Sequence, residues 1–274
     1  MTIHWGRQKP FLGSQINLAH PLAQRLVALY LMNEASGNTI TNLVDGSIGT
    51  LTGMAFPPTA TSGWNPGENG PALAFDGTDD CIPIGISTVT GAPCTICVNV
   101  SLASTQDGRI AGLYVGGQTR VMGLGAQEDA LDGYIHKFYI QHYDGSQALA
   151  RDTDEVVLGK IYQVVGVFES NSLRLLYVDG RLRATETTSQ GSIGTIDKFT
   201  LGRSEFATPG QYMDGTVENA FLYNRALTAS EIMELYLAPC SMFDIELWPW
   251  LSAAVAAGLS IPVAMRYYRN MRIR

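Results

Sequence analysis

The sequence predicts an all-β protein built from antiparallel sheets. Short segments in which apolar and polar residues alternate recur along the chain, and turn residues separate them at close intervals. The 29 glycines among 274 residues supply many turns, and hydrophobic residues make up 46% of the chain. Only residues 228–236 carry the full pattern of a capped helix. We expect one large β domain with additional segments, or two small domains.

Residues 1–19 predict an extended arm. They are polar, contain Gly and Pro, and carry Trp5 and Phe11 as isolated aromatic residues. No apolar leader segment is present here, so we expect the protein to be made and folded in a reducing cytoplasm. The following stretch, residues 22–32, is apolar, and its periodicity fits either a helix or a buried strand.

The next part of the chain alternates turns and short strands. Asn, Asp, Gly and Pro mark the turns, since these residues adopt or stabilise turn conformations. The pattern predicts strands at 48–56, 72–75 and 81–86, a Pro/Gly-rich loop at 63–71, and a turn at 76–80.

Seven further segments favour β-strands up to residue 203. They are TICVNVSLA, RIAGLYVGG, GYIHKFYIQHY, YQVVGVFE, LRLLYVDG, RATETT and KFTLGR. The first contains Cys94 and Cys97, a single CxxC pair. Residues three apart in a strand point to opposite faces, so we expect buried free thiols here and neither a metal nor a disulfide.

The stretch from residue 212 to 236 predicts the closing elements of the domain. We expect a turn at 213–216, an alternating strand at 217–223 and a short helix. Thr228 is the expected N-cap and Glu231 the N3 residue of a capping box.

The pattern breaks after Pro239. Residues 247–265 contain no charged residue, and Trp248 and Trp250 lie at their start. This length is at the edge of what spans a membrane. Pro262 and the many small residues favour the alternative, a tail that packs on a protein surface.

Four motifs resemble one family of β domains. They are NLAHPLA (17–23), GPALAFDGTDD (70–80), YVDG (177–180) and LGR (201–203), the last followed by the 212–236 stretch. In this order they resemble the laminin-G-like branch of the concanavalin A-like lectin/glucanase superfamily, of the kind encoded by tailed bacteriophages. The resemblance implies a jelly-roll sandwich of two antiparallel sheets at residues 20–240, between the arm and an apolar, basic-ended tail at 241–274.

Charge is unevenly distributed along the chain. The net charge is −7, but residues 20–243 carry 12 basic and 23 acidic side chains, a net of −11. Such an acidic body argues against nucleic-acid binding. The two basic ends are suited to docking on another surface.

The resemblance also implies a possible calcium ion at the edge of the sandwich. Calcium prefers carboxylate and carbonyl oxygens. The candidate ligands are Asp76, Asp79, Asp80, Asp214 and Glu218. The alternative is that Asp76 and Asp214 are turn residues paired with the glycines that follow them, and that no cofactor is bound.

Catalytic patterns are weak. The chain has no E-x-D-x-E run of the kind that glucanases use, and no G-x-S-x-G motif. His136 and His142 lie about 20 Å apart on one predicted strand face, and we expect both to be exposed or at the rim. We therefore expect a protein without enzymatic activity. Possible aromatic platforms for a glycan are Trp64 and Tyr134, with Tyr114 and Tyr143 as further candidates.

Two function classes follow. The first is a structural virion protein, a head decoration or cement protein that assembles with other capsid subunits or with copies of itself. Trp5, Phe11, Trp248 and Trp250 would dock on the neighbouring subunits. The alternative is a lectin that binds glycans or a cell surface and that residues 247–265 could tether to a membrane.

Overall fold

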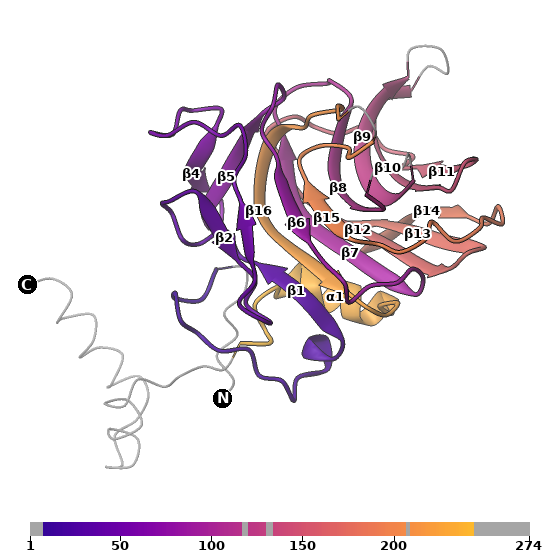
Figure 1. The fold of residues 1–274 in the computed structure, drawn as a ribbon, viewed down its shortest axis with the longest axis horizontal. Coiled ribbons are helices and arrows are strands. Elements are labelled where there is room, and N and C mark those ends of the chain that lie inside the picture. The colour runs from indigo at the N-terminus through magenta and orange to yellow at the C-terminus, as the bar shows by residue number, and fades with distance from the viewer. Residues whose placement is uncertain (1–7, 117–119, 130–133, 207–208, 244–274) are drawn as a thin grey trace, which may run out of the picture.

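The protein is a sandwich of two large antiparallel sheets, as a computed structural model of the chain shows (Figure 1). The structure describes residues 8–116, 120–129, 134–206 and 209–243, without the side chains of residues 128–129 and 134–135. Trp5, Trp248, Trp250 and the apolar segment 247–265 lie outside the described residues.

The strands form two large sheets and one small one. The eight-stranded sheet runs in the order β14 (Arg181–Glu186), β13 (Leu173–Val178), β12 (Ile161–Ser170), β7 (Cys94–Leu102), β16 (Asp214–Tyr223), β5 (Gly70–Asp76) and β4 (Gly63–Gly67), and β1 (Leu26–Tyr30) also pairs with β16. The six-stranded sheet runs β11 (Gln147–Arg151), β10 (Tyr134–Tyr143), β9 (Val121–Asp129), β8 (Gly108–Tyr114), β15 (Lys198–Leu201) and β6 (Ile82–Gly85). The small sheet pairs β2 (Thr39–Thr41) with β3 (Ile48–Thr50). The predicted jelly-roll sandwich is confirmed.

Strand β16 joins the beginning of the domain to its end. Its first half, Asp214–Val217, pairs with β5, while its second half, Ala220–Tyr223, pairs with β1 along the same edge. The other edge pairs with β7. The strand is longer than predicted, because Asp214 and Gly215 pair with Asp76 and Phe75 and extend the ladder into the expected turn.

Two apolar clusters stabilise the fold. One fills the space between the large sheets. The other lies on the opposite face of the eight-stranded sheet, under β1, helix α1 (Ala229–Leu237) and residues 240–243. Cys94 belongs to the first cluster and Cys97 to the second. The prediction that these buried free thiols point to opposite faces is confirmed.

Helix α1 begins at the predicted cap. The Thr228 side chain accepts a hydrogen bond from the Glu231 backbone N–H, and the Glu231 carboxylate accepts one from the Thr228 N–H. This reciprocal pair satisfies two N–H groups that have no partner within the helix. Ile232 and Leu235 then pack against the sheet.

Two ambiguous or incorrect predictions concern the first third of the chain. The apolar stretch 22–32 contains strand β1 at residues 26–30, preceded by a short 3₁₀ helix, η1 (Pro21–Ala23). The expected loop at 63–71 is instead the β4–β5 hairpin. Pro66 is compatible with β4 because this is an edge strand, where a missing N–H breaks no ladder hydrogen bond.

The predicted domain boundaries do not mark breaks in packing. Residues 8–19 lie against the sandwich, and Ile16 forms a β-bridge with Phe243. The backbone N–H of Asn17 donates to the carbonyl of Met242 over 2.8 Å. Met242 and Phe243 are buried in the second cluster. The body of the protein therefore includes the inner part of both predicted end segments.

Candidate functional site

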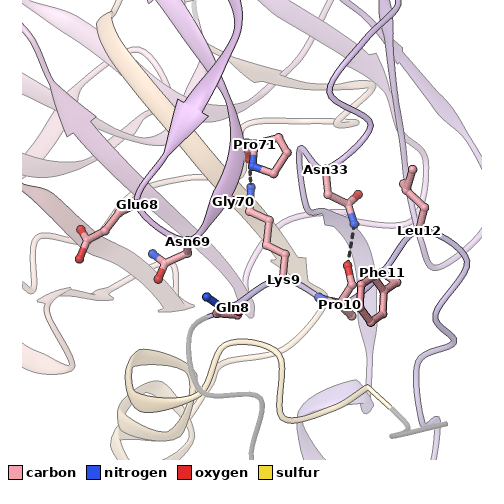
Figure 2. A pocket seen from close by; sticks show the side chains of 10 residues that line it. All are labelled: Gln8, Lys9, Pro10, Phe11, Leu12, Asn33, Glu68, Asn69, Gly70 and Pro71. Atoms are coloured by element: carbon pink, nitrogen blue, oxygen red, sulfur yellow. Dashed lines mark hydrogen bonds between the residues drawn. The ribbon is translucent and has the colours of Figure 1, made fainter. Parts of the chain in front are cut away.

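A groove runs between residues 8–12 and the tip of the β4–β5 hairpin (Figure 2). We call it the arm groove. It encloses about 590 Å³ and is lined by Gln8, Lys9, Pro10, Phe11, Leu12, Asn33, Glu68, Asn69, Gly70 and Pro71. Its walls thus come from the start of the chain, from the turn after β1 and from the hairpin.

Lys9 anchors the arm side of the groove. Its ammonium group donates to the carbonyl of Pro71 and, over 3.3 Å, to that of Met32. Burial lowers the pKa of Lys9 from 10.5 to about 8, and the nearby Glu218 carboxylate opposes this shift. The Asn33 amide donates to the Pro10 carbonyl over 3.1 Å and fixes the next residue of the arm.

Glu218 fixes the hairpin side of the groove. This side chain is 1% exposed. Its Oε1 accepts from the backbone N–H groups of Glu68 (2.5 Å) and Asn69 (3.1 Å), and its Oε2 accepts from the Asn69 amide (2.7 Å). A buried carboxylate is stable when several donors satisfy it. The hairpin tip is therefore held rigidly against β16.

The open side of the groove combines apolar and polar groups. Phe11 is 54% exposed and Leu12 is 65% exposed. Figure 2 shows Phe11 at one end and Glu68 and Asn69 at the other, with Lys9 between them. An exposed aromatic ring beside amide and carboxylate groups can contact the C–H face of a small polar ligand and hydrogen-bond its hydroxyls.

The structure brings three of the five predicted metal ligands together. Carboxylate oxygens of Asp76, Asp79 and Asp80 lie within 4.8 Å of one another. Asp80 is fully buried, its Oδ2 accepts from the Asp76 N–H over 3.0 Å, and its Oδ1 has no hydrogen-bond partner among the described residues. Burial raises the pKa of Asp80. Carboxylate oxygens and an unsatisfied buried carboxylate fit a calcium ion, which would neutralise their mutual repulsion.

The other two predicted metal ligands lie outside this cluster. Asp214 pairs with Asp76 through the backbone and lies against the turn, since a Cβ on Gly77 would be 2.9 Å from the Cβ of Asp214. Its carboxylate is not in the cluster. Glu218 is four residues further along β16 and binds the hairpin tip instead. The prediction for Glu218 is therefore corrected, because its oxygens are occupied by N–H donors.

The aromatic platforms predicted for glycans are not platforms in the structure. Trp64 is 7% exposed and belongs to the inner core, and its indole N–H donates to the Gly37 carbonyl over 2.8 Å. Tyr114 is fully buried across Gly112, and its hydroxyl donates to the Arg203 carbonyl. Tyr143 is half-buried, and the side chain of Tyr134 lies outside the described part.

The predicted exposure of the two strand histidines is wrong. His136 is 2% exposed and His142 is 1% exposed. His136 lies two residues before the core residue Phe138, and His142 lies two residues after the core residue Ile140. Alternate residues of a strand share a face, so both histidines point between the sheets. Sequence alternation in β10 could not show which face is covered, because this depends on the register with the neighbouring strands.

Sequence reasoning found Phe11 but missed the rest of the arm groove. Lys9, Asn33 and Asn69 are far apart in the chain and belong to no motif. The only local signal was the turn composition of residues 68–71 and 33–38. Among the residues that the structure describes, no helix has the length and apolarity needed to cross a membrane.

Comparison with known proteins agrees with this architecture. Residues 76–233 match the family model described as concanavalin A-like lectin/glucanases superfamily. No match is found among curated proteins.

Two solved structures illustrate the similarity of fold. Domain 4 of an extracellular arabinanase from Geobacillus stearothermophilus, in complex with arabinotriose, superposes with a TM-score of 0.59 at 16% identity, covering 77% of this chain and 98% of that domain. Trypanosoma rangeli sialidase in complex with sialic acid gives a TM-score of 0.56 at 17% identity, covering 83% of this chain and 36% of the sialidase. Because the family model matches more than half of its residues, this chain belongs to the concanavalin A-like lectin/glucanases superfamily.

Proposed function

We propose that this chain is a non-catalytic carbohydrate-binding module and that its ligand lies in the arm groove. The observation that carries the proposal is the exposed Phe11 ring beside polar side chains on a rigid base. Lys9 and Glu218 hold that base through hydrogen bonds to four separate backbone groups. A preformed site costs little conformational entropy when it binds a ligand.

The chemistry of the groove supports binding rather than hydrolysis. Glycoside hydrolysis needs two carboxyl groups on either side of the scissile bond. Among the described residues that line the groove, only Glu68 carries a carboxyl group. Glu218 lies behind it, and its carboxylate already accepts three hydrogen bonds. The arabinanase domain, a complex with a trisaccharide, supports the same class of function through the shared fold.

We expect Phe11→Ala to weaken glycan binding about tenfold, since loss of an aromatic contact costs about 1 kcal/mol or more. Phe56→Ala is the matched control, because Phe56 is 49% exposed and does not line the groove. A glycan array identifies the ligand, and titration calorimetry with the best array ligand measures the change. The proposal is wrong if the wild-type protein binds no glycan, or if both variants bind equally well.

The same glycan array tests whether binding depends on calcium. The array is probed with calcium and with a chelator. Asp76, Asp79 and Asp80 would hold the ion at the turn after β5, where it would neutralise their charges. We propose that calcium stabilises this turn and is not a ligand of the glycan, because the three carboxylates do not line the arm groove.

A second candidate function is a structural role in the virion of a tailed phage, as a head decoration protein made in the host cytoplasm. The favouring observation is the Ile16–Phe243 bridge, which places both ends of the body side by side, near the exposed Phe11 and Leu12. The uncharged segment 247–265 follows directly in sequence. Both ends could then dock on one neighbouring subunit, including another copy of this chain.

Deletion of residues 244–274 tests this second candidate. We expect the shortened protein to be monodisperse in light scattering and to lose its place in assembled particles, measured as a stoichiometric band in purified virions. A shortened protein that still joins particles would exclude docking through the tail. Release from a membrane fraction would instead favour a membrane-tethered lectin.

A further inference from the structure

A second hollow adjoins the arm groove at the start of strand β5. We call it the proline hollow. It encloses about 450 Å³, and its walls are Ala35, residues 64–67 of β4, and Gly70 and Pro71 of β5. Gly70 and Pro71 also line the arm groove, which encloses about 590 Å³. The first two residues of β5 are therefore a wall that the two hollows share.

The turn after β1 forms another wall of both hollows. Asn33 lines the arm groove, and Ala35, two residues further along this turn, lines the proline hollow. Lys9 connects the turn to β5, because its ammonium group donates to the carbonyls of Met32 and Pro71 (Figure 2). These hydrogen bonds hold the two segments at a fixed separation. The two hollows thus lie side by side along the same pair of walls.

The proline hollow is apolar where the arm groove is polar. Among the described residues, no charged side chain lines it. Ala35 and Pro66 are exposed and present their apolar groups to it, while Trp64 is 7% exposed and contributes only a small part of its surface. The indole N–H of Trp64 and the amide group of Asn65 already donate to backbone carbonyls. The side chains of this hollow therefore offer apolar contact and no free hydrogen-bond donor.

We propose that the two hollows bind consecutive residues of one oligosaccharide, and that the sugar in the proline hollow carries an acetamido group. This inference rests on the glycan-binding function proposed for the arm groove. Small-ligand pockets enclose about 300–1,000 Å³, so each hollow is large enough for a sugar residue of its own. A chain that passes Gly70 and Pro71 would place one residue in each hollow.

The walls of the proline hollow select for a neutral group with an apolar end. The acetamido methyl group can pack against Ala35, Pro66 and Pro71 and remove apolar surface from water. A sugar with hydroxyl groups alone would lose hydrogen bonds to water there, because the side chains offer no donor in return. A carboxylate-bearing sugar would find no cation among the described lining residues. An N-acetylated sugar therefore matches this hollow best.

Titration with short glycans, followed by ¹H–¹⁵N NMR, tests the proposal. The probes are N-acetylglucosamine, diacetylchitobiose and cellobiose. We expect diacetylchitobiose to bind about tenfold more tightly than N-acetylglucosamine, because only the disaccharide reaches both hollows. Cellobiose has the same linkage but no acetamido groups, and it should bind about tenfold more weakly than diacetylchitobiose. Diacetylchitobiose should shift the backbone amide signals of Ala35 and Gly67, which line only the proline hollow of the two.

Two variants change the proline hollow and leave the arm groove intact. Ala35→Gln narrows it, and Ala35 already has a positive φ of 57°, so another side chain unbranched at Cβ adds little backbone strain. This variant should bind diacetylchitobiose only as tightly as N-acetylglucosamine. Pro66→Ala should weaken diacetylchitobiose binding about threefold. Ala60→Gln is the matched control, because Ala60 is exposed and lines neither hollow. Phe11→Ala should weaken binding of both acetylated sugars.

Three outcomes would overturn this inference while the arm-groove function stands. Diacetylchitobiose could bind no more tightly than N-acetylglucosamine, or cellobiose could bind equally well. Ala35→Gln and Pro66→Ala could both bind diacetylchitobiose like Ala60→Gln, which would place the second sugar elsewhere. The chitin-derived sugars could also fail to bind while another array glycan binds in a Phe11-dependent manner. If no glycan binds at all, the function proposed for the arm groove fails, and this inference fails with it.

Discussion

Replacement of Glu218 by alanine should lower the free energy of unfolding by about 3 kcal/mol. Its buried carboxylate accepts hydrogen bonds from the backbone N–H groups of Glu68 and Asn69 and from the side-chain amide of Asn69. Hydrogen bonds to a charged group contribute about 1.5–3 kcal/mol each, and three that share one acceptor are not additive. Urea unfolding at pH 7 measures the change.

The same variant should loosen the β4–β5 hairpin before the rest of the sandwich. Hydrogen exchange at the Glu68 and Asn69 amides should become faster, because both lose their acceptor. Glu218→Gln should show about half the loss, since one oxygen can still serve the backbone donors while its amide faces that of Asn69. Glu234→Ala is the control, because this side chain is 44% exposed. If Glu218→Ala were as stable as this control, the hairpin would be held by other contacts.

Acidification should destabilise the protein through His142 by about 2–3 kcal/mol. Burial lowers the pKa of this imidazole from 6.5 to about 4, and the positive charge of Arg174 adds to the effect. Below pH 6.5 the unfolded chain therefore takes up a proton that the folded protein still excludes. The stability contributed by neutral His142 is complete above pH 6.5 and is lost as the pH falls toward 4.

Comparison with His142→Leu separates the acid destabilisation caused by His142 from that caused by the many carboxylates that also titrate. Urea unfolding at pH 7 and pH 4.5 should show a smaller acid loss for this variant than for the wild type. His20→Asn serves as the control, because the His20 side chain is 22% exposed and lies 3.6 Å from the Glu234 carboxylate. An acid loss that is identical in the wild type and in His142→Leu would refute the prediction.

The arm groove depends on contacts that alternation patterns do not encode. Glu218 was expected beside Asp76, yet a bulge between Val217 and Asn219 and the register of β16 place it at the hairpin tip. The Gly63–Pro71 segment has the composition of a loop but forms an edge hairpin, because the Glu218 carboxylate accepts hydrogen bonds from the backbone N–H groups of its turn. Trp64 and the two strand histidines were misjudged for the same reason, since their exposure depends on distant segments that cover them.

Local patterns in the sequence by themselves determined the all-β class, the capped helix at Thr228 and the opposite orientations of Cys94 and Cys97. These features follow from side-chain alternation and from contacts three residues apart, which short segments encode directly. Only the tertiary structure decided where Lys9 and Glu218 meet the hairpin. Such features arise from strand register and from the packing of segments more than 60 residues apart, to which no local pattern corresponds.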